Sequence, residues 1–185
     1  MKLKIITKVM PTMFLILILG FSQVGTSWAA TAKEIDVSVD VALQRFVKEV
    51  KGAKEFLDAA KGVLILPKVI NAGFIVGGEY GEGALRIGGK TVAYYNIVSA
   101  SLGYQIGGQQ KDILLIFMDE KALKKFRNSA GWKAGVDGTV AMIKIGAEGS
   151  IDTKLKEPIV GFVFGQKGLM VGASIEGSKF TKLTK

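Results

Sequence analysis

The residue types that most often carry out catalysis are scarce in this chain. Its 185 residues include no histidine and no cysteine, which removes most zinc sites, haem ligation and the Ser–His–Asp and Cys–His arrangements. The glycine-rich stretch 77–83 lacks the Lys-Ser/Thr ending of a phosphate-binding loop, and its two carboxylates would repel phosphate. The 16 acidic residues form neither a recognisable glycosidase pair nor an EF-hand loop. We therefore expect a protein that is not an enzyme and uses no metal or cofactor.

The strongest chemical signal is a surplus of positive charge. Lys and Arg number 25 against 16 Asp and Glu, which gives a formal net charge of +9. Such a surplus favours anionic partners, such as lipid headgroups, acidic glycans or lipopolysaccharide. The basic residues near the start of the expected domain are the candidate lipid-binding residues: Lys33, Arg45, Lys48, Lys51, Lys54, Lys61 and Lys68.

Several of these basic residues belong to a segment with helical periodicity. Apolar residues recur at steps of three and four over residues 32–61, which predicts an amphipathic helix or a helix pair broken near Gly52. Gly62 is a natural stop, and Pro67 forbids continuation. Two interpretations remain open. In the first, the apolar stripe packs on a sheet while the lysines face water. In the second, the segment lies at a membrane interface.

Beyond Gly62 the periodicity becomes that of strands. Asp119 is expected to cap a short helix over residues 120–128, and Trp132 is expected in the core, with an exposed interfacial position as the alternative. The chain is thus expected to be α+β, an antiparallel sheet or sandwich with an N-terminal amphipathic helical segment and one short inserted helix. The expected strands are residues 63–66, 73–85, 91–98, 101–108, 113–118, 138–146, 149–154, 159–164 and 169–175.

The first 29 residues have the order of a secretory signal peptide. Lys2, Lys4 and Lys8 precede the apolar run 13–20, and small residues at positions 27 and 29 suit cleavage after Ala29. The run is shorter than the ~20 residues that span a bilayer, so a retained anchor is the less favoured alternative. We expect residues 30–185 to form a single domain that is periplasmic or secreted and peripherally associated with a membrane. Nucleic acid is a poor partner in that compartment.

A series of ordered motifs across about residues 32–183 resembles the SYLF domain, also called the Ysc84-type domain. The motifs are AKGVLILP at 60–67, AGF at 72–74, GGEYGEGAL at 77–85, FRNS at 126–129, GW at 131–132, GVD at 135–137, GFVFGQKGLM at 161–170 and EGSK at 176–179. They consist mostly of glycine and apolar residues, which shape a fold and do not single out a headgroup site.

The resemblance implies lipid binding. Eukaryotic SYLF proteins bind phosphoinositides, with an amphipathic N-terminal segment implicated, and yeast-type members also bind actin. This chain is similar to exported bacterial members that stand alone without an SH3 domain. Export would separate it from cytoplasmic actin, so we do not expect actin to be a partner. Anionic phospholipids or lipid phosphates, such as phosphatidylglycerol, cardiolipin or lipid A, are the better candidates.

Two other functions compete with this expectation. Glycine- and aromatic-rich strands also suit an outer-membrane protein that crosses the bilayer with its strands, although the helical start and the inserted helix argue against it. The chain is alternatively a structural or partner-binding protein of the cell envelope without lipid affinity.

Overall fold

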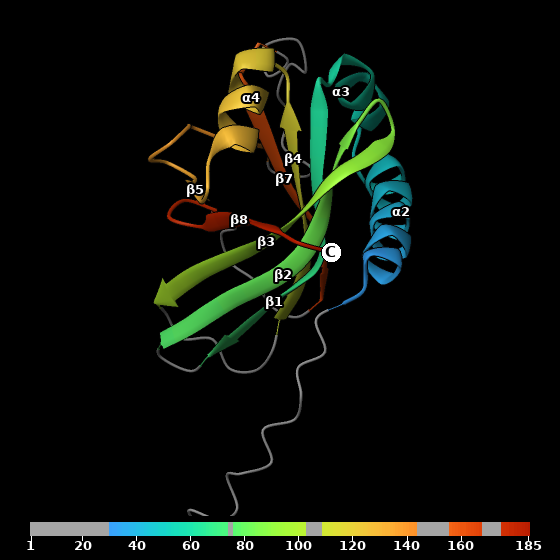
Figure 1. Cartoon of the computed structure of the whole chain (residues 1–185). Helices are drawn as coiled ribbons and strands as arrows, with labels where there is room; N and C mark the ends of the chain where they lie inside the picture. Colours follow the sequence, from blue (N-terminus) through green and yellow to red (C-terminus); the bar gives the residue numbers. More distant parts are fainter. Residues whose placement is uncertain (1–29, 74–75, 103–108, 144–155, 168–174) are drawn as a thin grey trace, which may run out of the picture.

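The computed structural model describes residues 30–73, 76–102, 109–143, 156–167 and 175–185. Three helices and eight strands alternate irregularly along them (Figure 1). The helices are α2 (Ala32–Glu49), α3 (Ala53–Ala59) and α4 (Glu120–Asn128). The strands are β1 (Gly62–Gly73), β2 (Val76–Ile87), β3 (Lys90–Leu102), β4 (Gln109–Phe117), β5 (Trp132–Lys133), β6 (Ala141–Ile143), β7 (Ile159–Lys167) and β8 (Lys179–Leu183).

The N-terminal helical segment is the predicted helix pair. Helix α2 begins with a capping box, in which the Thr31 side chain accepts from the Glu34 backbone N–H and the Glu34 carboxylate accepts from the Thr31 backbone N–H. These hydrogen bonds lower the pKa of Glu34. Gly52 breaks the helix with φ 79°, a left-handed conformation that glycine adopts without a steric cost. The break near Gly52 is confirmed.

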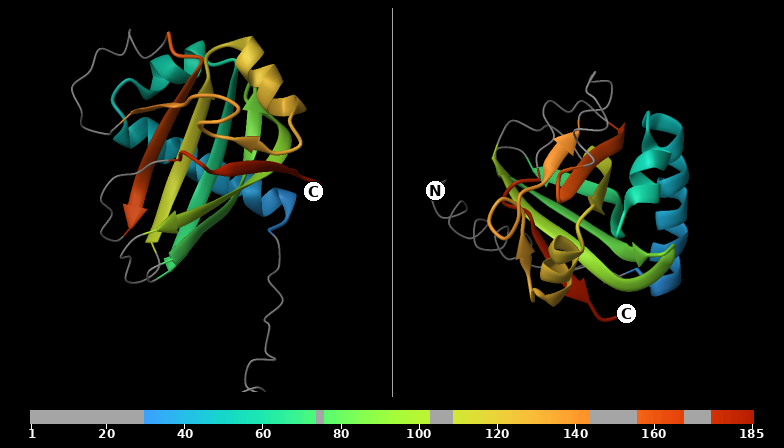
Figure 2. Two further views of the ribbon diagram at one scale, coloured as in Figure 1. Left: turned by 90° about the vertical axis from the view of Figure 1, so that its left-hand side faces the viewer. Right: turned by 90° about the horizontal axis from the view of Figure 1, so that it is seen from above.

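All eight strands belong to one curled sheet in the order β5-β8-β3-β2-β1-β4-β7-β6. Every described pairing between these strands is antiparallel except the one between β6 and β7. Helices α2 and α3 cover one face of the sheet, and α4 lies on the other (Figures 1 and 2). The predicted α+β class is confirmed, with a single sheet and not a sandwich.

A hydrophobic core lies on each face of the sheet. On the α4 face, the Phe126 ring packs against Tyr95 and Phe117 in tilted contacts and against Trp132 edge to face. On the α2 face, Phe46 meets Phe162 edge to face, with ring centroids 4.9 Å apart. Strand β4 is buried from Lys111 to Phe117 because it faces both cores. The core position of Trp132 and the helix that Asp119 caps were both predicted correctly.

Strand β1 continues past Pro67, although the sequence predicted only residues 63–66. Pro67 and Lys68 form a bulge, since the pairing with β4 shifts register between Leu66 and Val69. Lys68 has φ 53°, and its backbone N–H donates to the buried Asp112 carboxylate over 2.9 Å. A bulge accommodates proline because the ladder is interrupted there, so Pro67 ends no strand.

Other predicted strand boundaries need correction. Residues 91–98 and 101–102 form one continuous strand, β3, because β2 pairs with it along its whole length. Residues 109–112 belong to β4, so this strand begins before the predicted residue 113. Strands β5 and β8 were not predicted. The predicted strand 149–154, most of 169–175, and residues 103–108 and 144–146 lie outside the described part of the chain.

Gly83 offers a test of how closely β1 and β2 approach each other. A Cβ at this position would overlap the Ile65 carbonyl oxygen and lie 2.8 Å from Leu66 Cα, both of them backbone atoms. We expect Gly83→Ala to lower the free energy of unfolding by about 3 kcal/mol, measured by urea denaturation. The control is Gly78→Ala on the same strand, where the added Cβ would meet only Ser99 O at 3.6 Å. Equal midpoints for the two variants would contradict the expected packing.

Candidate functional site

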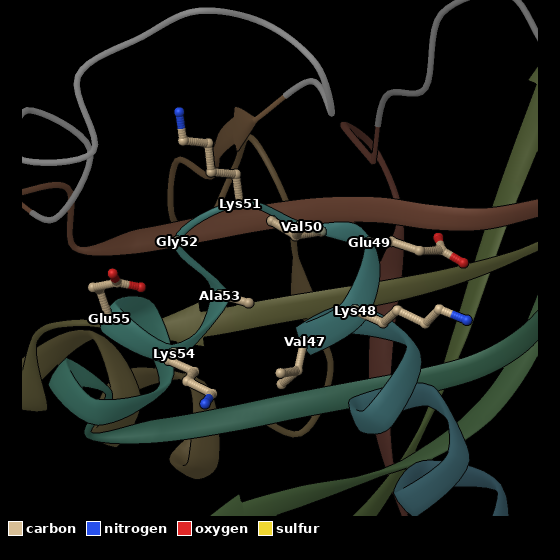
Figure 3. Close-up of a pocket in the computed structure, with 9 residues that line it drawn as sticks. All are labelled: Val47, Lys48, Glu49, Val50, Lys51, Gly52, Ala53, Lys54 and Glu55. Carbon is tan, nitrogen blue, oxygen red and sulfur yellow. The ribbon is translucent and has the colours of Figure 1, made fainter.

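A solvent-facing hollow of about 440 Å³ lies where α2 turns into α3. Gly52 makes it possible, because its left-handed backbone lets the chain turn within three residues before α3 begins. The Ala53 backbone N–H donates to Val50 O over 3.2 Å and fixes the turn. The residues that line the hollow are Val47, Lys48, Glu49, Val50, Lys51, Gly52, Ala53, Lys54 and Glu55 (Figure 3).

Three of the seven predicted lipid-binding residues meet at this hollow. Lys48, Lys51 and Lys54 are all exposed, and within the described part of the chain none of them forms a salt bridge. Figure 3 shows that Lys51 extends on the other side of the connecting backbone from Lys48 and Lys54. The three ammonium groups therefore spread around the turn and do not converge on one point, an arrangement that suits an extended anionic surface better than a single phosphate.

Two carboxylates share the hollow with the lysines. Glu49 is engaged, since its Oε2 accepts from the Gly165 backbone N–H over 3.3 Å. Glu55 lies on α3 and is exposed. The residues that line the hollow thus carry three ammonium groups and two carboxylates, so their own attraction for anions is moderate. The positive net charge of the whole chain adds to this attraction.

Arg45, a fourth predicted residue, serves the fold. Its guanidinium forms an ion pair with Asp112 of β4, and the Arg45 side chain is 31% exposed whereas Asp112 is 1% exposed. Asp112 Oδ1 also accepts the Lys68 backbone N–H. The pair ties the C-terminal half of α2 to the bulged part of the sheet. Because the Asp112 carboxylate is negative, it also compensates most of the positive charge of Arg45.

The remaining three predicted residues lie apart from the hollow. Lys33 is 15 residues before Lys48 on α2, a separation of about 22 Å along the helix axis. Lys61 follows α3, and its backbone N–H donates to Phe117 O. Lys68 belongs to the β1 bulge. All three side chains are exposed.

The apolar stripe of α2 is not available to a membrane. Ile35, Val39, Ala42 and Phe46 are each at most 3% exposed, because the stripe packs on the sheet. Polar contacts reinforce this docking: the Asp36 carboxylate accepts from Thr91 Oγ1 at 2.8 Å and from the Tyr94 hydroxyl at 2.9 Å. Burial, followed by the Asp36 interaction, raises the pKa of Tyr94. Of the two interpretations of this segment, packing on the sheet is confirmed.

A buried ionic network was missed by the sequence analysis. Lys111 Nζ donates to Glu79 Oε1 at 2.6 Å, and the two side chains are 2% and 6% exposed. Asn71 Nδ2 and Ser99 Oγ donate to the same carboxylate, at 3.1 and 3.2 Å. Residues 77–83 are thus part of strand β2, and the side chain of Glu79 points into the protein. The alternation of Glu79, Gly81 and Gly83 with outward residues is the signal that could have revealed it.

The hydrogen bonds of Glu79 indicate a structural role for this buried network. The Glu79 carboxylate already accepts from three side chains, so it has little capacity left for a substrate. Among the residues that the structure describes, no three Asp or Glu side chains come together as a metal site would require. In the same part of the chain, no helix has both the length and the apolar character needed to span a bilayer.

Comparison with known proteins finds similarity to one family. Residues 98–185 match the model of the Ysc84 family, described as Las17-binding protein actin regulator. The SH3 domain-containing YSC84-like protein 1 of Xenopus laevis is 30% identical over 125 residues, which cover 64% of this chain and 37% of that protein. The Homo sapiens protein of the same name is 33% identical over 125 residues, covering 64% and 36%. Over residues 98–185 the chain is thus similar to the Ysc84 family, and the relatives found carry the same family name. The chain spans little more than a third of the length of the curated relatives it matches.

The buried pair that ties α2 to the sheet can be tested by removing one charge. We expect Asp112→Asn to lower the free energy of unfolding by about 2 kcal/mol, because a buried carboxylate with two donors is lost. Asp40→Asn is the control, since Asp40 pairs with Arg86 while 58% exposed. It should cost less than about 1 kcal/mol. Chemical denaturation measures both, and a control that loses as much stability as Asp112→Asn would refute the assignment.

Proposed function

We propose that this chain is a non-enzymatic, peripheral membrane domain that associates with anionic phospholipids in the cell envelope. The observation that carries the proposal is the set of three exposed lysines spread around the α2–α3 turn (Figure 3). A near-surface lysine contributes about 1 kcal/mol on an anionic leaflet, so three supply about 3 kcal/mol at low salt. The resemblance to lipid-binding SYLF domains supports the same ligand class.

Membrane contact in this proposal uses the folded surface. The apolar residues of α2 are already buried against the sheet, so the helix presents charge and not a lipid-inserting face. The interaction is therefore mainly electrostatic and should weaken as salt screens it. The expected signal peptide places this contact at a periplasmic or secreted membrane surface.

Actin is not the partner we propose, although the description of the family model names actin regulation. The expected signal at residues 1–29 would direct the chain away from cytoplasmic actin. Co-sedimentation with filamentous actin is the direct check, and saturable pelleting would overturn this part of the proposal.

The proposal is tested by charge reversal at the hollow. Vesicle co-sedimentation with the exported protein should show binding to phosphatidylglycerol-containing vesicles and little binding to neutral phosphatidylcholine vesicles. The triple variant Lys48→Glu, Lys51→Glu, Lys54→Glu should bind about 100-fold more weakly, because three contributions of about 1 kcal/mol are lost.

The matched control changes the same net charge elsewhere. Lys121, Lys124 and Lys182 are exposed. The first two lie on α4, and Lys182 is paired with Tyr95, which faces the α4 core. Reversing these three should reduce vesicle binding much less. Equal loss in both triple variants would mean that only net charge matters, and equal binding to neutral vesicles would refute the electrostatic basis.

A further inference from the structure

An exposed apolar row crosses the sheet beyond the end of α2. Ile70 of β1, Tyr80 of β2 and Val98 of β3 are direct cross-strand partners, and they are 54%, 50% and 48% exposed. Large apolar side chains on adjacent strands are normally covered, and three exposed together form a patch. Figure 1 shows that the ends of β1, β2 and β3 project past α2, and the exposed fractions show that no described element covers the three side chains.

The row lies on the same face of the sheet as α2. Tyr80 is four residues from Ala84 on β2, and Val98 is four residues from Tyr94 on β3, so each shares its face with that residue. Ala84 and Tyr94 both belong to the core beneath α2. The lysines of the α2–α3 hollow and the apolar row are therefore on the same side of the sheet.

Cations flank the row. Lys179 of β8 is the cross-strand partner of Val98, and Lys133 of β5 is the partner of Lys179; both side chains are exposed. Lys68, also exposed, precedes Ile70 by two residues. The nearby carboxylate of Glu82 is engaged by Lys185 Nζ at 2.8 Å and by the Tyr80 hydroxyl at 2.7 Å. The surroundings of the row thus favour an anionic partner.

The row has the chemistry of an interfacial membrane contact. Three half-exposed side chains offer on the order of 300 Å², well below the ~800 Å² per partner of a stable protein interface. Tyr80 combines an apolar ring with a polar hydroxyl, a combination enriched at the boundary between lipid tails and water. A small apolar row with basic neighbours can enter that boundary while its cations meet headgroup phosphates.

We propose that Ile70, Tyr80 and Val98 form the apolar contact of this domain with an anionic bilayer, inserting into the interfacial zone while Lys68, Lys133 and Lys179 meet lipid phosphates. The proposal rests on the proposed membrane association and deepens it. The exposed end of the sheet, and not the helix stripe, supplies the apolar part of the interaction.

The experiment uses two valines of one strand as a matched pair. Val92 is 44% exposed on β3, about 20 Å along the strand from Val98. Because the chain has no cysteine, Val98→Cys and Val92→Cys each give a single site for an environment-sensitive fluorophore. When phosphatidylglycerol vesicles are added, the emission maximum of the label at position 98 should shift to the blue, and that of the label at position 92 should not. Val98→Asp should weaken vesicle binding about tenfold and Val92→Asp less than twofold.

The outcomes distinguish a failure of this inference from a failure of the proposed function. If the exported protein binds vesicles but the labels and the Asp variants at 92 and 98 behave alike, the row is not the contact and the proposed function stands. If the protein binds no anionic vesicle, both proposals fail. A blue shift at 98 that depends on protein concentration without lipid would make a second copy the occupant and overturn the inference.

Discussion

The arrangement of this domain depends on the contacts that the buried carboxylate of Asp112 makes with α2 and with strand β1. This carboxylate accepts the guanidinium of Arg45 from α2 and the backbone N–H of Lys68 from the β1 bulge. The bulge adds one residue to β1, so Leu66 and Val69 both face the α4 core. In a regular strand the residue that faces that core would be Ile70 instead, and the exposed row would lose its first member. One buried charge thereby positions the helix and exposes the apolar row.

Local signals predicted the helices well, because each depends on residues within one or two turns. The capping box at Thr31 and Glu34, the left-handed Gly52 and the Asp119 cap all act over at most three residues. Strand extents were predicted less well. Strand β3 is continuous because β2 pairs with it to Leu102. Strand β1 passes Pro67 because Asp112, 44 residues after Lys68, stabilises the bulge. Such long-range partners leave no mark in local periodicity.

The same distinction explains what could be predicted of the site. Lys48, Lys51 and Lys54 were candidate lipid-binding residues of the expected helical segment, and they line one hollow. The turn at Gly52 then separates Lys51 from the other two, which a continuous helix would not do (Figure 3). Arg45 looked equivalent to the lysines, but its partner is 67 residues away on β4. The burial of Lys111 was not predicted, because its partner Glu79 lies 32 residues away on β2.

For the membrane association that we propose, the energetics favour contact by the folded surface over helix insertion. Exposing Ile35, Val39, Ala42 and Phe46 to a bilayer would first remove them from the core, at a cost of roughly 1.5–3 kcal/mol for each large side chain. Losing several such contacts would approach the whole stability of a typical domain, about 5–15 kcal/mol. The exposed lysines and the row of Ile70, Tyr80 and Val98 require no unpacking. Charge attraction and shallow apolar insertion can therefore act together on the native fold, and α2 can remain docked while the domain is bound.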